Sequence, residues 1–314
     1  MSERRYGKFA AGIVSLRAQD ANWNADFSGW PRKLPGGGFY STDKALKYTI
    51  RRYLKEVKNQ NLIFWRVYDE KGQVGNLLAM LEKNKIKTDT NIAKQVLEKC
   101  LDVRLFGGTF TLKNQQFSIT GPVQITYGID VWGKGKPYVS QIQSPKYEGK
   151  ERGEESKAEY GPQTTLGSEV RLTEGHYVFD FTINPNNLEK DDFLASSAPE
   201  VFLSNDDVEM FKEALIHGPG YTTSTTKTGV FTELVIFAEF EIEDGFVPLV
   251  PILRDGVSVQ KSNGDNLKRK IDIRRVVGVL KELGANRIEL YFRPDLCEIE
   301  YDKEDGIMEV EIKP

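Results

Sequence analysis

The sequence is poor in the residues that most often perform catalysis or hold metals. Its 314 residues include two cysteines, Cys100 and Cys297, and two histidines, His176 and His217. The cysteines lie far apart, outside any zinc-ligand spacing. Neither histidine has a Ser or Cys partner at a recognisable spacing, so a catalytic triad is not supported. Walker and Rossmann glycine patterns are also missing. We therefore expect no metal, no cofactor and no catalytic residue.

Long apolar runs are scarce too. No stretch approaches the ~20 apolar residues that a membrane span needs, and residues 9–16 are too short for the apolar part of a signal peptide. The hydrophobic content of 39% is ordinary for a globular protein. With two thiols that we expect to be buried and reduced, the composition indicates a cytoplasmic protein without membrane contact.

Charge is distributed unevenly along the chain. The net charge is −3, but residues 1–60 carry twelve Lys and Arg against five Asp and Glu, so the remainder is strongly acidic. Such asymmetry indicates a local basic surface on a protein whose remaining surface is acidic, and the acidic residues keep the protein soluble. Chance clustering would give the same asymmetry.

Apolar periodicity predicts alternating strands and helices. We expect a central first strand at 9–17, a Gly/Pro-rich loop at 20–38, and a helix that Ser41 or Thr42 caps and that ends near Lys58. Further along, the pattern predicts an extended segment at 62–68, a helix at 90–101, strands at 104–112, 117–127, 176–183, 230–240 and 287–292, helices at 205–217 and 271–283, and a hairpin at 297–312. The sum is an α+β fold, one domain over residues 1–314 with insertions.

The helix after Thr42 has two distinct sides. Leu46, Ile50, Tyr53, Leu54 and Val57 form an apolar side, while Lys44, Lys47, Arg51, Lys55 and Lys58 form a basic stripe. Cations about one turn apart suit a phosphate backbone. Lys44 lies in the first turn, where the helix dipole disfavours a cation, so local stability does not explain it. A solvated helix face remains the alternative.

Three other groups of residues are open to two interpretations. Gly107–Gly108 ends a strand-like run, where it allows either close approach of a ligand or a β-bulge. Asp20, Asn22 and Asp26 share one loop, so a divalent-metal site is conceivable, although loop acids usually face solvent. A basic cluster at residues 269–275 either contacts nucleic acid or has no such role.

Four phrases resemble the backbone subunit of type I CRISPR Cascade complexes, the Cas seven family of RAMP proteins, in its subtype I-B form. They are Asp20-Ala-Asn-Trp-Asn-Ala-Asp26 with Pro31–Arg32, the basic helix over residues 42–51, the pair Asp102–Gly108 and Gly121–Gly128, and Ser224-Thr-Thr-Lys227 before the strand at 230–240. Trp23 and Ala25 depart from the family's usual Pro and Gly in the first phrase.

This resemblance implies an RRM-like, ferredoxin-like palm with inserted finger and thumb elements. The thumb or finger loop would occupy 140–170, where residues 145–163 are too charged to bury a core and would form a protruding or disordered loop. Residues 244–314 would be a C-terminal helix and hairpin extension.

The resemblance also implies a non-catalytic subunit that binds CRISPR guide RNA (crRNA) and oligomerises helically along it. Its partners would be target DNA paired to the guide, copies of itself, other Cascade subunits and a recruited helicase-nuclease of this antiviral defence system. The expected RNA-binding residues are Asn22, Arg32, Lys44, Lys47, Arg51, Arg104, Gly107, Gly108 and Lys227. The alternatives are a metal-dependent target-RNA endonuclease, as in type III relatives, with Asp20 or Asp26 catalytic, and a generic RNA-binding module.

Overall fold

The computed structural model describes residues 5–113, 115–144, 165–241, 250–262, 265–303 and 306–313. The large sheet contains β1 (Phe9–Ala21), β8 (Thr165–Ile183), β9 (Val230–Phe240) and the short β5 (Val123–Ile125). Their order is β9-β1-β8-β5, and each neighbouring pair is antiparallel. The helix α1 (Asp43–Glu56) lies between β1 and β5 in the chain, and α7 (Asn205–Tyr221) lies between β8 and β9. Two interlocked β-α-β units in this order form a ferredoxin-like, RRM-like palm.

Strand β1 is central, as the sequence indicates, because its two faces meet two different cores. Val14 and Leu16 face the core beneath α1 and α7. Ala11 and Ile13 face the opposite core, which the C-terminal part of the chain covers. Alternate residues of a strand point to opposite faces, so small and apolar side chains are required on both.

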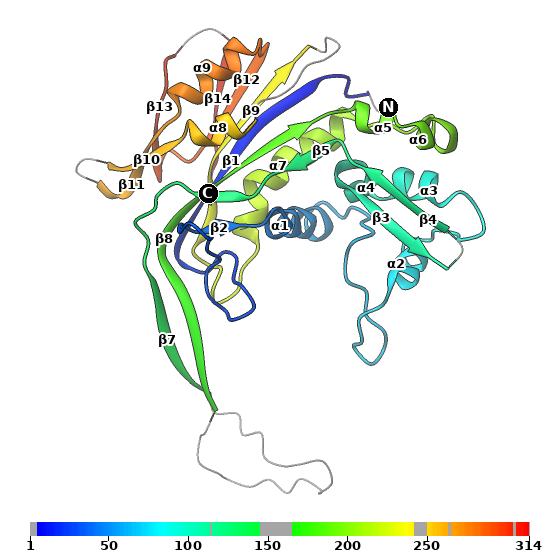
Figure 1. Cartoon of the computed structure of the whole chain (residues 1–314), viewed down its shortest axis with the longest axis horizontal. Coiled ribbons are helices and arrows are strands. Elements are labelled where there is room, and N and C mark those ends of the chain that lie inside the picture. Colours follow the sequence, from blue (N-terminus) through cyan, green and yellow to red (C-terminus); the bar gives the residue numbers. More distant parts are fainter. Residues whose placement is uncertain are drawn as a thin grey trace, which may run out of the picture.

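The helices α1 and α7 pack side by side on one face of the palm (Figure 1). Leu46, Ile50 and Leu54 of α1 are fully buried, as is Leu215 of α7. The helix α1 begins after Thr42, as predicted, and ends at Glu56, two residues before the predicted end. In contrast, α7 continues through Gly218 and Pro219 to Tyr221, beyond the predicted end at residue 217.

Residues 61–120 form a helical insertion beside the palm (Figure 1). It contains α2 (Leu77–Lys83), α3 (Ile92–Lys99), α4 (Leu101–Phe106) and the hairpin β3–β4 (Gly107–Leu112 and Gln115–Thr120) around its own apolar cluster. The strand predicted at 104–112 was wrong in its first part, because residues 101–106 are helical. The predicted strand at 117–127 is divided between β4 and β5.

The turn from α4 into β3 depends on glycine. Gly107 has φ +69° and ψ −163°, a backbone conformation that is essentially restricted to glycine. A Cβ atom there would lie 2.0 Å from the carbonyl oxygen of Ile119, and one on Gly121 would lie 2.3 Å from the nitrogen of Gly107. The two glycines therefore let the α4–β3 turn and the end of β4 touch backbone to backbone.

The long hairpin of β7 (Pro137–Ser144) and β8 extends away from the palm (Figure 1). The two strands pair over eight positions, from Pro137 with Leu172 to Ser144 with Thr165. The expected loop at 145–163 lies outside the described residues. Two short strands, β2 (Tyr40–Ser41) and β6 (Gly128–Asp130), complete this side of the sheet.

The C-terminal module, residues 250–313, covers the other face of the palm (Figure 1). It contains α8 (Val250–Asp255), β10 (Ser258–Ser262), β11 (Asp265–Asp272), α9 (Arg274–Glu282), β12 (Arg287–Phe292), β13 (Cys297–Glu300) and β14 (Ile307–Glu311). The predicted hairpin at 297–312 was wrong, because β13 pairs in parallel with β11 whereas β14 pairs in parallel with β12, in a different sheet.

Two short connecting helices, α5 (Asn186–Glu189) and α6 (Asp192–Ser197), lie beside the helical insertion.

A buried ionic network joins this module to the palm. The carboxylate of Glu174 accepts two bonds from the guanidinium of Arg269, at 2.8 and 2.9 Å, and lies 3.0 Å from Arg17. His176 lies between Glu174, at 3.1 Å, and Glu233, at 2.7 Å. Burial alone would lower the pKa of His176, but the two carboxylates raise it from 6.5 to about 9. The charged imidazolium is therefore the form that the folded protein stabilises.

This network predicts a loss of stability at alkaline pH. Because the pKa of His176 is raised on folding, its contribution is complete below about pH 6.5 and is lost as pH rises through about 9. Urea unfolding of the protein and of His176→Gln should show a free-energy difference of at most about 3 kcal/mol that shrinks over this interval. A difference independent of pH would contradict this assignment.

The α4–β3 turn predicts a second effect on stability. Gly107→Ala should lower the free energy of unfolding by about 2 kcal/mol or more, because alanine is strained at this φ and ψ. Gly36→Ala is the matched control, since nothing lies within 4 Å of the added Cβ. Thermal denaturation of both variants checks this, and equal melting temperatures would show that the turn tolerates a side chain.

Candidate nucleic-acid interface

The N-terminus of α1 is tied to the loop at residues 22–38. Thr42 Oγ1 accepts the N–H of Ala45 at 3.4 Å and so caps the helix. Thr42 itself donates its backbone N–H, at 3.0 Å, and its hydroxyl, at 3.2 Å, to Oδ1 of Asn24. The loop is therefore fixed beside the first turn of α1. We call the cations of this loop and of α1 the basic face and define it by Arg32, Lys33, Lys44, Lys47 and Arg51.

The three cations of α1 on this face differ in how far they are engaged. Lys44 is exposed, and within the described residues no carboxylate pairs with it. Lys47 pairs with Asp43 at 3.2 Å, with 13% of its side chain exposed. Arg51 pairs with Asp102 at 3.2 Å and lies over the rings of Phe106, at 5.2 Å, and Phe64, at 5.8 Å. Lys44 is thus the most available of the three.

Asp102 fixes Arg51 from inside the protein. Its carboxylate is fully buried and accepts the backbone N–H groups of Ile63, at 2.9 Å, and Phe64, at 3.0 Å. Arg51 supplies the compensating positive charge. The arrangement positions the guanidinium at the junction of α1 and the helical insertion, with 18% of the side chain still exposed.

The loop contributes two further cations. Arg32 is half-buried, and its Nε has no hydrogen-bond partner in the described structure. Lys33 is exposed, with its ammonium 5.3 Å from the centre of the Phe39 ring. Asp26 lies in the same loop, and burial alone would raise its pKa, but backbone N–H groups of Trp30 and Ser28 lower it. Its carboxylate therefore stabilises the turn of the loop by accepting these N–H groups.

Asn22 is placed inside this loop. Its side-chain amide donates to the carbonyls of Gly29, at 2.9 Å, and Val170 on β8, at 3.1 Å. The oxygen Oδ1 is buried without a partner among the described residues. An RNA contact of Asn22 stays a prediction, and the structure gives the side chain a second role in attaching the loop to the long hairpin.

Three other predicted RNA contacts are engaged within the protein. Arg104 pairs with Asp207 of α7 through two bonds, at 2.8 and 3.0 Å. Lys227 donates to the carbonyl of Trp23 and lies over its ring, and burial lowers its pKa. A Cβ on Gly108 would lie 2.3 Å from the ring of Phe64. Gly107 and Gly108 thus have a packing reason to be glycine, whether or not RNA approaches them.

The other groups that the sequence singled out have structural partners. Asp20 accepts from the hydroxyl of Tyr138 at 3.2 Å. In the described part of the chain, no group of three His, Cys, Asp or Glu is arranged to hold a metal ion. In the basic cluster at residues 269–275, Arg269 is in the buried network, Lys270 pairs with Glu300 at 3.0 Å and Arg274 pairs with Asp272.

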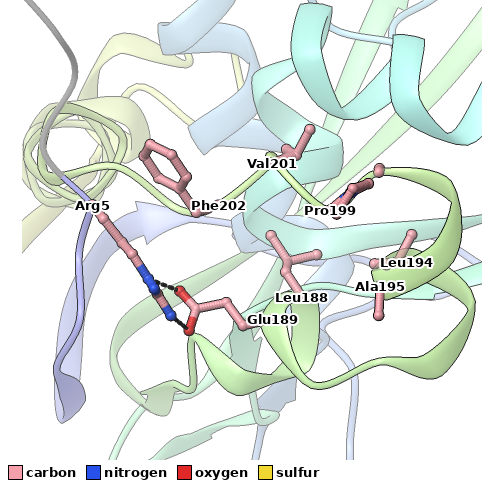
Figure 2. Close-up of a pocket in the computed structure, with 9 residues that line it drawn as sticks. Arg5, Leu188, Glu189, Leu194, Ala195, Pro199, Val201 and Phe202 are labelled. Atoms are coloured by element: carbon pink, nitrogen blue, oxygen red, sulfur yellow. Dashed lines mark hydrogen bonds and ion pairs between the residues drawn. The ribbon is translucent and has the colours of Figure 1, made fainter.

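A hollow of about 310 Å³ lies near the N-terminal segment, between α5, α6 and residues 199–202 (Figure 2). Its two charged lining residues, Arg5 and Glu189, pair with each other at one edge. Leu188, Leu194 and Val201 are among the apolar residues that line the rest. With its charges neutralised internally, this hollow lacks the net positive charge that a phosphate backbone requires.

Sequence reasoning assigned no role to three parts of the site. Asn24 and Asp102 lie inside phrases that carried the family resemblance, and that position was the available signal. The pair Tyr40–Tyr127 stacks at 5.7 Å beside the start of α1. It brings together residues far apart in the chain, so no local pattern could have revealed it.

No helix in the described part of the chain is long and apolar enough to cross a membrane. No curated protein matched the chain. The chain is similar to two solved structures at low sequence identity. A subunit of a "CRISPR RNA-guided surveillance complex, pre-nicking" has a TM-score of 0.52 at 14% identity, with 94% of this chain and 96% of that chain covered. A subunit of a "CRISPR RNA-guided surveillance complex" has a TM-score of 0.44 at 14% identity, with 93% and 95% covered.

The comparison with family models decides the assignment. The model of the CRISPR-associated protein Cas7 matches residues 10–277, which include all of the palm except Phe9, the helical insertion and the long hairpin. The basic face lies within this range. The chain therefore belongs to the CRISPR-associated protein Cas7 family, the family that its sequence resembles.

Proposed function

We propose that this protein is the backbone subunit of a CRISPR surveillance complex and holds the guide RNA by its phosphates. The observation that carries the proposal is the exposed Lys44 at the start of α1, beside a loop that Asn24 ties to the same turn. An unpaired ammonium is free to replace a counterion on RNA, which is the main source of sequence-independent affinity. Membership in the Cas7 family supports the proposal.

Recognition through phosphates suits a guide whose sequence varies. A subunit that read base edges would restrict the guide, whereas phosphate contacts fix position and carry no sequence information. The five cations of the basic face come from one helix and one loop. We infer that they follow the RNA backbone along α1, with Lys44, Lys33 and Arg32 in direct contact and Arg51 held in place by Asp102.

We further propose that copies of the chain repeat along one RNA, with other subunits of the complex at the ends of the array and a helicase-nuclease recruited to it. The long hairpin extends away from the palm over eight paired positions (Figure 1), and in such an array it would contact a neighbouring copy. A contact between such a hairpin and the body of the next copy is heterologous, and contacts of this kind generate open helical assemblies. Target DNA would then pair with the guide across several copies.

The proposal assigns no catalytic role to the loop carboxylates. Asp26 accepts N–H groups of its own loop, at 2.8 and 3.0 Å, and Asp20 accepts the hydroxyl of Tyr138. These bonds give both carboxylates a structural purpose. The metal-dependent RNase of the sequence analysis is therefore the second candidate, and it has a distinct test.

Replacement of Lys44 should weaken RNA binding equally for all sequences. Lys44→Ala should reduce the slope of log K against log salt by about one, the effect of one lost phosphate contact. Lys47→Ala should have a smaller effect, because Lys47 already pairs with Asp43. Titration of RNAs of several sequences at several salt concentrations measures this.

The matched control for Lys44→Ala is Lys303→Ala on the C-terminal module, where 77% of the side chain is exposed. It should leave both affinity and slope unchanged. If Lys44→Ala left the salt slope intact, or changed affinity for one sequence only, the basic face would not be the phosphate-binding surface.

Purification together with the other subunits of the complex tests the whole proposal. Sequencing of the bound nucleic acid should reveal one class of RNA, with constant ends around variable spacers. Incubation of that assembly with complementary RNA and Mg²⁺ should give no cleavage. Regular cuts that disappear in Asp20→Ala or Asp26→Ala would instead establish the RNase, and heterogeneous cellular RNA would indicate a generic RNA-binding module.

A further inference from the structure

A second hollow, of about 470 Å³, lies where the C-terminal part of α1 meets the helical insertion. Three cations line it: Lys55 from α1, Arg66 from the segment that follows, and Lys83 from α2. No carboxylate is among its lining residues. In a chain whose net charge is −3, three cations without a counter-charge mark a site for an anion.

These cations are available to a ligand. Within the described residues, Arg66 and Lys83 have no carboxylate partner, and both are exposed. Lys55 donates only to the carbonyl of Gln60, at 3.3 Å. Nearby cations are paired instead: Arg52 of α1 pairs with Glu56, and Lys58, two residues beyond the end of α1, pairs with Glu213. The difference shows that the free cations gather at the hollow while those nearby are neutralised.

Aromatic side chains line the same hollow. Trp65 is half-buried, and Tyr68 has 58% of its surface exposed. The ring of Trp65 stacks on Tyr48 of α1, with centroids 5.8 Å apart and planes 18° from parallel. Free cations beside stacked aromatic rings are the combination that binds single-stranded nucleic acid, since cations meet phosphates and rings stack on bases.

The segment that presents these rings is fixed by its own hydrogen bonds. Gly75 donates its N–H to the carbonyl of Val67 at 2.8 Å. Asp69 accepts the N–H groups of Lys71 and Gln73, at 2.9 and 2.8 Å, and closes the turn. The backbone on either side of Tyr68 is thus fixed before a ligand arrives, which reduces the entropy cost of binding.

The hollow continues the basic face along α1. Lys44, Tyr48, Arg51 and Lys55 follow one another at helical spacings of four, three and four residues, and therefore form one row on the helix surface. Tyr48, 45% exposed, stands between Lys44 and the Trp65 ring. An RNA backbone that follows this row from Lys44 arrives at the hollow.

We propose that this hollow receives an unpaired nucleotide, whose base stacks on Trp65 and Tyr68 while its phosphates meet Arg66, Lys83 and Lys55. The inference rests on the proposed function, because it assumes that nucleic acid follows α1. The contact selects for an unstacked base and not for its identity, since every base has a face that stacks. The nucleotide belongs either to the guide or to the target strand.

The test compares RNA with and without bases. Binding of an oligouridylate and of an abasic RNA of the same length is measured for the protein and for Tyr68→Leu and Trp65→Leu. Each replacement should reduce affinity for the oligouridylate roughly tenfold and leave affinity for the abasic RNA unchanged, because a leucine cannot stack on a base. The double variant Arg66→Gln with Lys83→Gln should weaken the binding of both RNAs, because it removes contacts with phosphates.

Controls separate the possible outcomes. Phe193→Leu removes an aromatic ring of α6, 41% exposed and outside the hollow, and should change neither affinity. If Tyr68→Leu and Trp65→Leu bind both RNAs with the affinity of the unmodified protein, the hollow is not a nucleotide site. The proposed function still stands in that case if Lys44→Ala lowers the affinity for RNA. If Lys44→Ala has no effect either, both fail.

Photocrosslinking in the assembled complex identifies the strand. Photoreactive uridines are placed in the guide in one experiment and in a complementary DNA in the other. Crosslinks to residues 65–68 from one strand only should appear and assign the nucleotide to that strand. Complexes that give crosslinks to α1 and none to residues 65–68 would overturn the proposal.

Discussion

The buried carboxylate of Asp102 is the point on which the arrangement of the basic face depends. It accepts the N–H groups of Ile63 and Phe64, where the helical insertion leaves the palm, and it pairs with Arg51 of α1. Removal of one partner from such a buried pair typically costs about 3–5 kcal/mol, because the other charge is left uncompensated. Asp102 therefore fixes the insertion, α1 and the cations of α1 relative to one another. The palm alone would supply the helix without this orientation.

From this junction, α1 presents two kinds of surface. Near its N-terminus, the exposed Lys44 and the loop cations present positive charge without a pocket for a base. Such a surface suits the phosphates of RNA of any sequence. Towards its C-terminus the same row meets the rings of Trp65 and Tyr68 and three cations in a hollow. In the proposed arrangement, charge would guide the RNA backbone along the helix, and aromatic surface would be available where a base is unstacked. Neither contact would depend on sequence, as a subunit that carries variable guides requires.

Local pattern predicted much of the palm and little of the site. The strand β1, the Thr42 cap of α1 and the strands β9 and β12 follow from periodicity and capping residues, which act over a few positions. The ion pair of Arg104 with Asp207 could not be predicted, because the two residues are 103 positions apart in the chain. The prediction of a C-terminal hairpin was wrong for the same reason. Apolar and polar residues alternate in β13 and β14 as in a hairpin, but the two strands pair with β11 and β12 and not with each other. Gly107 was recognised as a special position and Gly121 only as the first residue of a segment that carries the family resemblance, because the backbone contact that requires both exists only in the folded chain.

The central claim is that RNA phosphates lie along α1, and an experimental structure of the RNA-bound assembly tests it most directly. The account predicts consecutive phosphates within ion-pair distance of the Lys44 ammonium and the Arg32 guanidinium, with the same contacts in every copy of the chain. RNA on the C-terminal module, or on the face of the palm that this module covers, with Lys44 left in solvent, would contradict the account.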